Sequence, residues 1–223
     1  MILAIDTATR WLGLALHDGA AVIAETGWRC LNNHTIELAP AIGAMLRHGG
    51  VAAADLDGIA VAIGPGSYTG LRVGLAEAKG LSLANGTPLL GVPTLDVVAA
   101  SFGPLPGQLA VIAEAGRARI VAALYQWVNG RGWQAENRPV VATWEEFLAG
   151  LDGRITFAGE IAPEAAKQIR AAGQRFQVVP AAGSARRAGY LAEIGWQRLR
   201  QGQTDDAASL APIYLKDPAG RDA

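Results

Sequence analysis

The segment from Gly58 to Asn85 constrains the fold more than any other part of the chain, because it reads as a strand, a glycine-rich loop and a helix. Branched apolar residues alternate with small ones in the predicted strand: Ile59, Val61 and Ile63. Apolar residues recur at helical spacing in the predicted helix: Leu71, Leu75, Ala78 and Leu81. The loop GPGSYTG precedes a helix N-terminus, which presents backbone N–H groups and the positive end of the helix dipole. It predicts either a tight structural turn or a loop that binds an anion or a partner.

The glycine loop matches neither common nucleotide-binding loop. The Walker pattern requires Gly and then Lys where this chain has Thr69 and Gly70, and the third glycine of GxGxxG is replaced by Thr69. A nucleophile elbow is also excluded, because Ser67 does not stand in GxSxG. Ser67 or Thr69 is suited to cap the following helix. The loop residues that we single out are Gly64, Gly66, Ser67, Thr69 and Gly70.

The composition favours a globular protein of the cytoplasm. The chain has 223 residues, of which 51% are hydrophobic, enough for one or two domains with substantial cores. Its net charge of −1 argues against binding a phosphate backbone unaided, so any nucleic-acid role must be shared. Cys30 is the only cysteine, which excludes an internal disulfide and a cysteine metal cluster and favours a small buried apolar role. We find no basic leader and no apolar run of membrane-spanning length, and expect no membrane contact.

The order of predicted elements repeats in the two halves of the chain. The first half has strands at 2–6, 11–17 and 21–28, a helix at 35–47, a strand at 59–63, a helix at 71–85, a strand at 89–92 and a helix at 94–101. The second half has strands at 109–113, 120–128 and 133–140, a helix at 143–148, a strand at 154–158, a helix at 163–172, a strand at 176–179 and a helix at 184–200. The segment GPLPG at 103–107 is the best linker. We therefore predict an α/β protein of two βββαβαβα halves, with domains at 1–103 and 104–223.

Four segments resemble the TsaB (YeaZ) family in the same order along the chain. They are MILAIDTAT at the start, NNHTIELAPAI from Asn32 to Ile42, GPGSYTGLRVGLAEAKGLSLA, and PIYLK near the end. The family's usual form of the third is GPGSFTGLRIG followed by an AKGLA-like helix. The resemblance implies the acetate-kinase/Hsp70/actin architecture, also called ASKHA or RNase H-like, and a last segment that packs back on the first domain.

The resemblance also implies a function. It suggests a non-catalytic scaffold that pairs with TsaD, recruits TsaE and helps make threonylcarbamoyladenosine next to the anticodon of tRNA. It further implies a homodimer when the chain is alone, tRNA contact only within the complex, no cofactor in the isolated chain, and ATP or ADP only in the complex.

Two helices, at 35–47 and 71–85, are implied to carry the partner surface, since both are rich in small residues that allow close approach. The residues that we assign to this surface are Thr35, Leu38, Ile42, Met45, Leu71, Gly74, Leu75 and Ala78. The alternative is that both helices simply cover a sheet.

The segment Asp6-Thr7-Ala8-Thr9, at a strand end beside a hairpin, resembles the first phosphate loop of kinases with this architecture. In such kinases an aspartate positions a magnesium-bound water. The resemblance to the TsaB family implies instead that Asp6, Thr7 and Thr9 form a vestigial loop, since fold does not imply function. The alternative function is a small kinase or nucleotide hydrolase that uses Asp6 and the cleft between domains.

A metal-dependent glycoprotease is the third hypothesis, after an old label on the wider family. The metal-binding relative TsaD uses a helical HxxxH motif, which places two imidazoles on one face. Here His34 is followed by Leu38 at the second position, so we expect no metal and no catalytic residue. We then expect His34 to be a capping or packing residue at the start of a helix, and Glu37 to be a solvated charge.

The turn from Glu114 to Arg119 departs from the DAR-like turn usual in the family, so contacts carried over to it are in doubt. Arg186 and Arg187 together have the pattern of a water-facing helix side.

Overall fold

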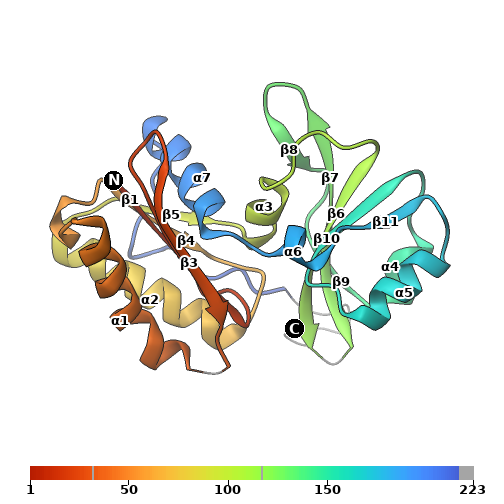
Figure 1. Ribbon diagram of the computed structural model, residues 1–223, viewed down its shortest axis with the longest axis horizontal. Coiled ribbons are helices and arrows are strands. Elements are labelled where there is room, and N and C mark those ends of the chain that lie inside the picture. The colour runs from red at the N-terminus through yellow and green to blue at the C-terminus, as the bar shows by residue number, and fades with distance from the viewer. Residues whose placement is uncertain (32, 117, 216–223) are drawn as a thin grey trace. The chain divides into compact units, whose positions relative to one another are not determined.

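The computed structural model describes residues 1–31, 33–116 and 118–215, which form two compact units. The first unit combines Met1–Val97 with Arg187–Ile213. The second contains Val98–Arg186, and the chain returns to it from Tyr214. Figure 1 shows the elements of both units.

The first unit is a five-stranded sheet in the order β3-β2-β1-β4-β5. Its strands are β1 (Ile2–Asp6), β2 (Trp11–His17), β3 (Val22–Arg29), β4 (Gly58–Ala62) and β5 (Leu89–Val92). The first three form an antiparallel meander, and β4 and β5 are parallel to β1. The connecting helices are α1 (His34–Gly49), the short 3-10 turn η1 (Ala53–Asp55), α2 (Tyr68–Asn85) and α3 (Thr94–Ala99). The predicted βββαβαβα order of this half therefore holds.

Helices cover both faces of this sheet. Leu3 and Ile5 of β1 belong to the cluster that contains the inward residues of α1 and most of those of α2. Ile2 and Ala4 point to the opposite face and belong to the cluster of Leu191 in α7 (Ala188–Arg200). A strand alternates its side chains between two faces, so a fully apolar strand requires a cover on each side.

The position of α7 differs from the predicted domain division. The predicted boundary at residue 103 assigned 184–200 to the second domain, whereas Arg187–Ile213 belongs to the first unit. In the structure α7 packs on β1, β2 and β4 of the first unit. The approach is close: a Cβ added at Gly195 would lie 2.6 Å from the Ala60 Cβ. The helix α7 also begins at Ala188, four residues later than predicted, and a separate short helix, α6 (Ala181–Ser184), precedes it.

The segment after α7 runs along the edge strand β5. The Asp205 N–H donates to the Leu89 carbonyl at 2.8 Å, and its Oδ2 accepts from the Gly91 N–H at 2.7 Å. Further on, the Ile213 N–H donates to the Ile63 carbonyl at 2.7 Å. The expected return of the last segment to the first domain thus holds for Ile213. Lys216 lies outside the described residues.

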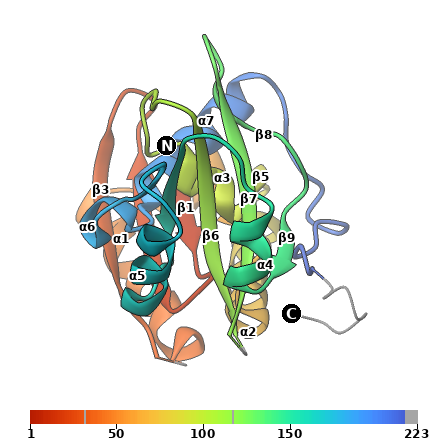
Figure 2. The same cartoon turned by 90° about the vertical axis from the view of Figure 1, so that its right-hand side faces the viewer.

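The second unit is a six-stranded sheet in which β9 pairs with β7 beside the path β11-β10-β6-β7-β8. Its strands are β6 (Gln108–Gly116), β7 (Arg119–Val128), β8 (Gly132–Ala135), β9 (Val140–Ala142), β10 (Ile155–Gly159) and β11 (Phe176–Val178). Its other helices are α4 (Trp144–Ala149) and α5 (Pro163–Ala171). Figure 2 shows the long hairpin of β6 and β7 beside α4 and α5.

A core of aromatic rings holds α4 to this second sheet. Phe157 of β10 is fully buried and meets the rings of Phe147 and Phe176 edge-on. The helix α4 begins with a capping box: the Thr143 Oγ1 accepts from the Glu146 N–H, and the Glu146 carboxylate accepts from the Thr143 N–H.

The predicted strand at 133–140 is wrong, since the structure has two short strands there, β8 and β9. Pro139 has no N–H to give to a ladder, which explains the break. No helix among the described residues combines the length and apolar character needed to cross a membrane.

Candidate functional site

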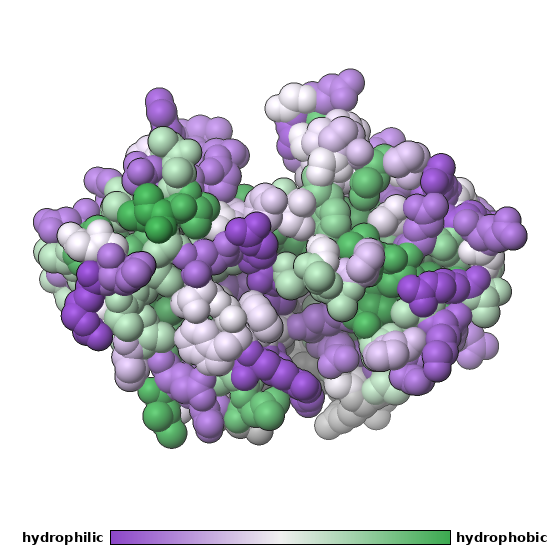
Figure 3. Space-filling view, viewed as in Figure 1, coloured by the Kyte–Doolittle hydropathy of each residue, from purple (hydrophilic) through white to green (hydrophobic). Residues whose placement is uncertain are grey.

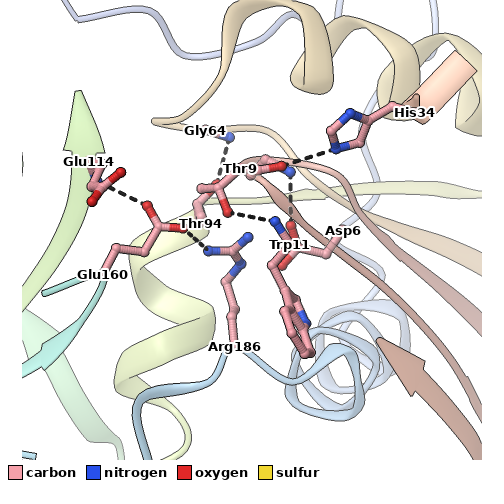
Figure 4. A network of polar contacts seen from close by, with 10 residues as sticks. Asp6, Thr9, Trp11, His34, Gly64, Thr94, Glu114, Glu160 and Arg186 are labelled. Carbon is pink, nitrogen blue, oxygen red and sulfur yellow. Dashed lines mark hydrogen bonds and ion pairs between the residues drawn. The ribbon is translucent and has the colours of Figure 1, made fainter. Parts of the chain in front are cut away.

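The loop from Asp6 to Thr9 joins β1 to β2 and is buried. Asp6, Thr7 and Thr9 are exposed by only 1%, 0% and 6%. The Asp6 Oδ1 accepts from the Ala8 N–H at 3.0 Å, and the Thr9 Oγ1 accepts from the Trp11 N–H at 3.3 Å (Figure 4). These polar groups hold the loop in shape from within.

The predicted glycine loop packs directly on this segment. The Ser67 N–H donates to the Ala8 carbonyl at 2.6 Å, and the Thr7 hydroxyl donates to the Gly70 carbonyl at 2.7 Å. A Cβ at Gly66 would collide with the Ala8 carbonyl oxygen, and one at Gly70 with the Thr7 carbonyl oxygen. These glycines are therefore required by a close backbone approach. This supports the structural alternative for the loop, while a ligand role for its residues stays a prediction.

The glycine loop also anchors the start of α2. Ser67 is the N-cap, and its Oγ accepts from the Gly70 N–H at 3.3 Å, as predicted for Ser67 or Thr69. Upstream, Gly64 donates its N–H to the Thr94 Oγ1 at 3.1 Å and accepts from the Thr94 N–H at 2.8 Å (Figure 4). Our sequence reasoning missed Thr94. A threonine at the end of β5 that begins the next helix was the available signal.

His34 is the first residue of α1 and lies against the same loop. Its Nε2 is 3.0 Å from the Thr9 carbonyl oxygen, which can only accept, so the Nε2–H donates. The second position of the HxxxH pattern, Leu38, is 1% exposed and lies in the core. Among the residues that the structure describes, no group of three or more His, Cys, Asp or Glu side chains could hold a metal.

We had expected Glu37 to be a solvated charge, but its carboxylate forms a hydrogen bond within the chain. Its Oε2 accepts a 2.6 Å hydrogen bond from the Trp28 indole N–H of β3, which lowers the pKa of the carboxyl group. Nearby Cys30 is 1% exposed within the core, and burial raises the pKa of its thiol. The structural role predicted for Cys30 is confirmed.

Most residues that we assigned to the partner surface face the sheet instead. Seven of the eight are buried: Leu38, Ile42, Met45, Leu71, Gly74, Leu75 and Ala78. Only Thr35 is exposed. The assignment is wrong for these seven residues because the apolar stripe of each helix packs on the sheet that the helix covers.

The outward sides of α1 and α2 carry a different set. Ile36 and Leu83 are 72% and 74% exposed. Small exposed residues accompany them: Ala39, Ala44, Ala76 and Gly80. We call these six residues the outward face. Apolar surface is visible in Figure 3 at the lower edge of the molecule, near the start of α1.

Comparisons with known proteins bear on the family of this chain. The profile of TsaD, described as tRNA N6-adenosine threonylcarbamoyltransferase, matches residues 29–221. The tRNA threonylcarbamoyladenosine biosynthesis protein TsaB of Bacillus subtilis (strain 168) is 33% identical over 218 residues, covering 96% of this chain and 93% of that protein. The chain belongs to the TsaB (YeaZ) family.

Further similarities support the family and its fold. TsaB of Escherichia coli (strain K12) is 29% identical over 225 residues, covering 97% of this chain and 94% of its own. The solved structure of YeaZ from Pseudomonas aeruginosa is 25% identical with a TM-score of 0.79, covering 96% of this chain and 99% of that one. The ethanolamine utilization protein EutJ of Carboxydothermus hydrogenoformans, 14% identical with a TM-score of 0.50 over 87% of this chain and 89% of its own, shares the fold alone. The predicted fold class and the TsaB resemblance are confirmed.

This TsaB family chain has Tyr68 where the usual GPGSFTG loop has Phe. The ring is 51% exposed at the start of α2, and the Arg72 guanidinium lies 3.8 Å from its centroid. Such stacking orients a cation on the surface beside the outward face.

The turn that departs from the TsaB family pattern is fastened by Glu160. Its Oε2 accepts from the Glu114 N–H at 3.0 Å, and its Oε1 lies 3.7 Å from the Arg186 Nη1 (Figure 4). Arg186 is only 7% exposed, so its predicted water-facing position is wrong. Ala118 in this turn has a positive φ of 59°, and Arg117 lies outside the described residues.

Proposed function

We propose that this chain is a non-catalytic subunit of the machinery that makes threonylcarbamoyladenosine in tRNA, and that it binds TsaD through the outward face of α1 and α2. The observation that carries the proposal is the exposure of Ile36 and Leu83 on this face. Large apolar side chains beside small ones are typical of an association surface. The relatives are named for threonylcarbamoyladenosine biosynthesis, and the resemblance to the TsaB family suggests TsaD as the partner.

The state of the candidate catalytic groups supports a non-catalytic role. A general base or nucleophile must reach its substrate. Here Asp6 and Thr7 are buried and hydrogen-bonded within the chain, and His34 donates to a backbone carbonyl. The alternative, a kinase or nucleotide hydrolase, requires this loop to open. Magnesium-dependent ATP binding that is lost in Asp6→Ala would favour that alternative.

The same proposal assigns the remaining partners. TsaE joins the complex, and tRNA binds only to the assembly, since the chain alone has a net charge of −1. ATP or ADP enters only with the complex. Without TsaD, the outward face pairs with a second copy. The proposal places the protein in the cytoplasm.

Light scattering tests the proposal by measuring the mass of the chain with and without TsaD of its own organism. We expect a homodimer to be replaced by a one-to-one complex. Ala76→Glu and Ile36→Glu place a charge on the outward face and should abolish the complex. Val140→Glu, at a 44% exposed apolar residue of β9, is the matched control and should leave it intact. If no complex of the chain with TsaD forms at equal concentrations, the proposal is refuted.

A further inference from the structure

The loop Asp6–Thr9 holds the first residues of both α1 and α2. On the α1 side, the His34 Nε2–H donates to the Thr9 carbonyl at 3.0 Å. On the α2 side, the Thr7 hydroxyl donates to the Gly70 carbonyl at 2.7 Å. The starts of the two helices, His34 and Tyr68, lie 34 residues apart in sequence and share one four-residue support.

The loop Asp6–Thr9 packs tightly against the glycine loop and the start of α2. A Cβ at Gly74 would collide with the Thr7 Oγ1, as those at Gly66 and Gly70 would with carbonyl oxygens of the loop. Backbone that packs this closely cannot slide independently, because well-packed interiors transmit displacement. The loop is also tied to the end of β3, since the Cys30 N–H donates to the Arg10 carbonyl at 2.7 Å.

We propose that Asp6–Thr9 is a positioning element that couples the starts of α1 and α2, so that Thr7 and His34 control how the outward face binds its partner. Neither side chain can reach that face, because Thr7 is 0% exposed and His34 is 7% exposed. The partner affinity rests on the function proposed above, whereas the coupling between helices does not.

A purely local role makes a different prediction. If each side chain only supported its own helix, removing the Thr7 hydroxyl would loosen α2 alone, and removing the His34 imidazole would loosen α1 alone. Coupling requires that each change also loosens the other helix, since coupling between two sites is reciprocal.

Hydrogen exchange of the whole chain separates the two cases without a partner. In Thr7→Val, which keeps the side-chain shape, we expect amide exchange in the first turns of α1 to rise roughly fivefold, comparable to the loss of one hydrogen bond. In His34→Leu, we expect a similar rise in the first turns of α2. Exchange that rises only in the helix touched by the altered side chain would overturn the coupling.

Partner affinity supplies the second readout. Thr7→Val and His34→Leu should each weaken TsaD binding by about tenfold, and the double variant should lose far less than the product, because the two residues share one support. The control is Asp205→Ala, which removes a partly buried contact on β5, the edge strand opposite β3 in the sheet. It should change the affinity less than twofold.

The two proposals fail in different ways. An equal loss of affinity in Asp205→Ala, or unchanged affinity in Thr7→Val, would overturn the positioning role while the scaffold function stands. Failure of the unaltered chain to bind TsaD would refute the proposed function, and hydrogen exchange would still decide the coupling.

Discussion

Glu25 on the edge strand β3 caps the helix α7, since its Oε1 accepts a 2.9 Å hydrogen bond from the N–H of Gly189, 164 positions later in the chain. Its Oε2 binds the guanidinium of Arg187, the N-cap residue, and this pairing raises the pKa of Arg187. No side chain caps α7 from within its own segment. A carboxylate at a helix N-terminus also meets the positive end of the dipole. The cap thus comes from tertiary structure.

Replacing this cap should destabilise the first unit. We expect Glu25→Ala to lower the free energy of unfolding by about 1–2 kcal/mol, the usual cost of losing an N-terminal cap. Urea denaturation followed by tryptophan fluorescence measures the change. Glu164→Ala is the control, because Glu164 and Lys167 form an ion pair that is 81% and 77% exposed and should contribute little. Equal losses in the two variants would contradict the capping role.

Two glycines of α2 should respond oppositely to the same substitution. Gly74→Ala places a Cβ against the Thr7 Oγ1, so overpacking should lower the free energy of unfolding by about 1–3 kcal/mol. Gly80→Ala meets nothing within 4 Å and should raise it by about 1 kcal/mol through helix propensity. Thermal and urea unfolding check both. A stabilised Gly74→Ala would show that the α2 backbone is not held against Thr7.

The Trp28–Glu37 hydrogen bond should make stability depend on pH. Because it lowers the pKa of Glu37 below its ordinary value of 4.5, the stabilisation is present above that pH and is lost as the pH falls through the folded-state pKa. We expect the difference in unfolding midpoint between the native chain and Trp28→Phe to shrink on acidification from pH 6. The control Glu37→Gln, compared in the same pH series, should show no such dependence with or without Trp28. A difference that is constant with pH would contradict the assignment.

Cys30 should react slowly with thiol reagents. Its side chain is 1% exposed, and burial raises the pKa of the thiol, so the reactive thiolate is scarce. We expect labelling in buffer to be slower than in 6 M guanidinium by about a hundredfold or more, since it requires opening of the core. The rate of absorbance change with an aromatic disulfide reagent measures this. Immediate labelling of the native chain would contradict the buried position.

The first unit should not fold from residues 1–103 alone. That fragment lacks α7 and leaves the apolar face of Ile2, Ala4 and Ala60 uncovered. We expect it to bind a hydrophobic dye and to unfold without a cooperative transition. A chain that joins residues 1–97 to 187–213 through a flexible linker restores the cover and should unfold cooperatively. Cooperative unfolding of 1–103 would contradict the role of α7.

The sequence alone determined the elements that depend on near neighbours. Alternation and helical spacing predicted the strands and helices of the first half. A cap at Ser67 or Thr69 was recognisable because a cap bonds a residue three positions away. The family was also recognisable, since each of the four matching segments is contiguous in the sequence. The same local reasoning correctly found that His34 lacks its second ligand at Leu38.

Only the tertiary structure decided which surfaces are buried and which remain outside. Leu38 and Ile36 are both apolar and lie on one helix, yet the sheet covers the first and leaves the second exposed. The assignment of α7 to the first unit and the cap of Gly189 by Glu25 likewise depend on groups far apart in sequence. Periodicity reports that a helix has an apolar side, but the partner of that side is set by long-range packing, which local spacing does not encode.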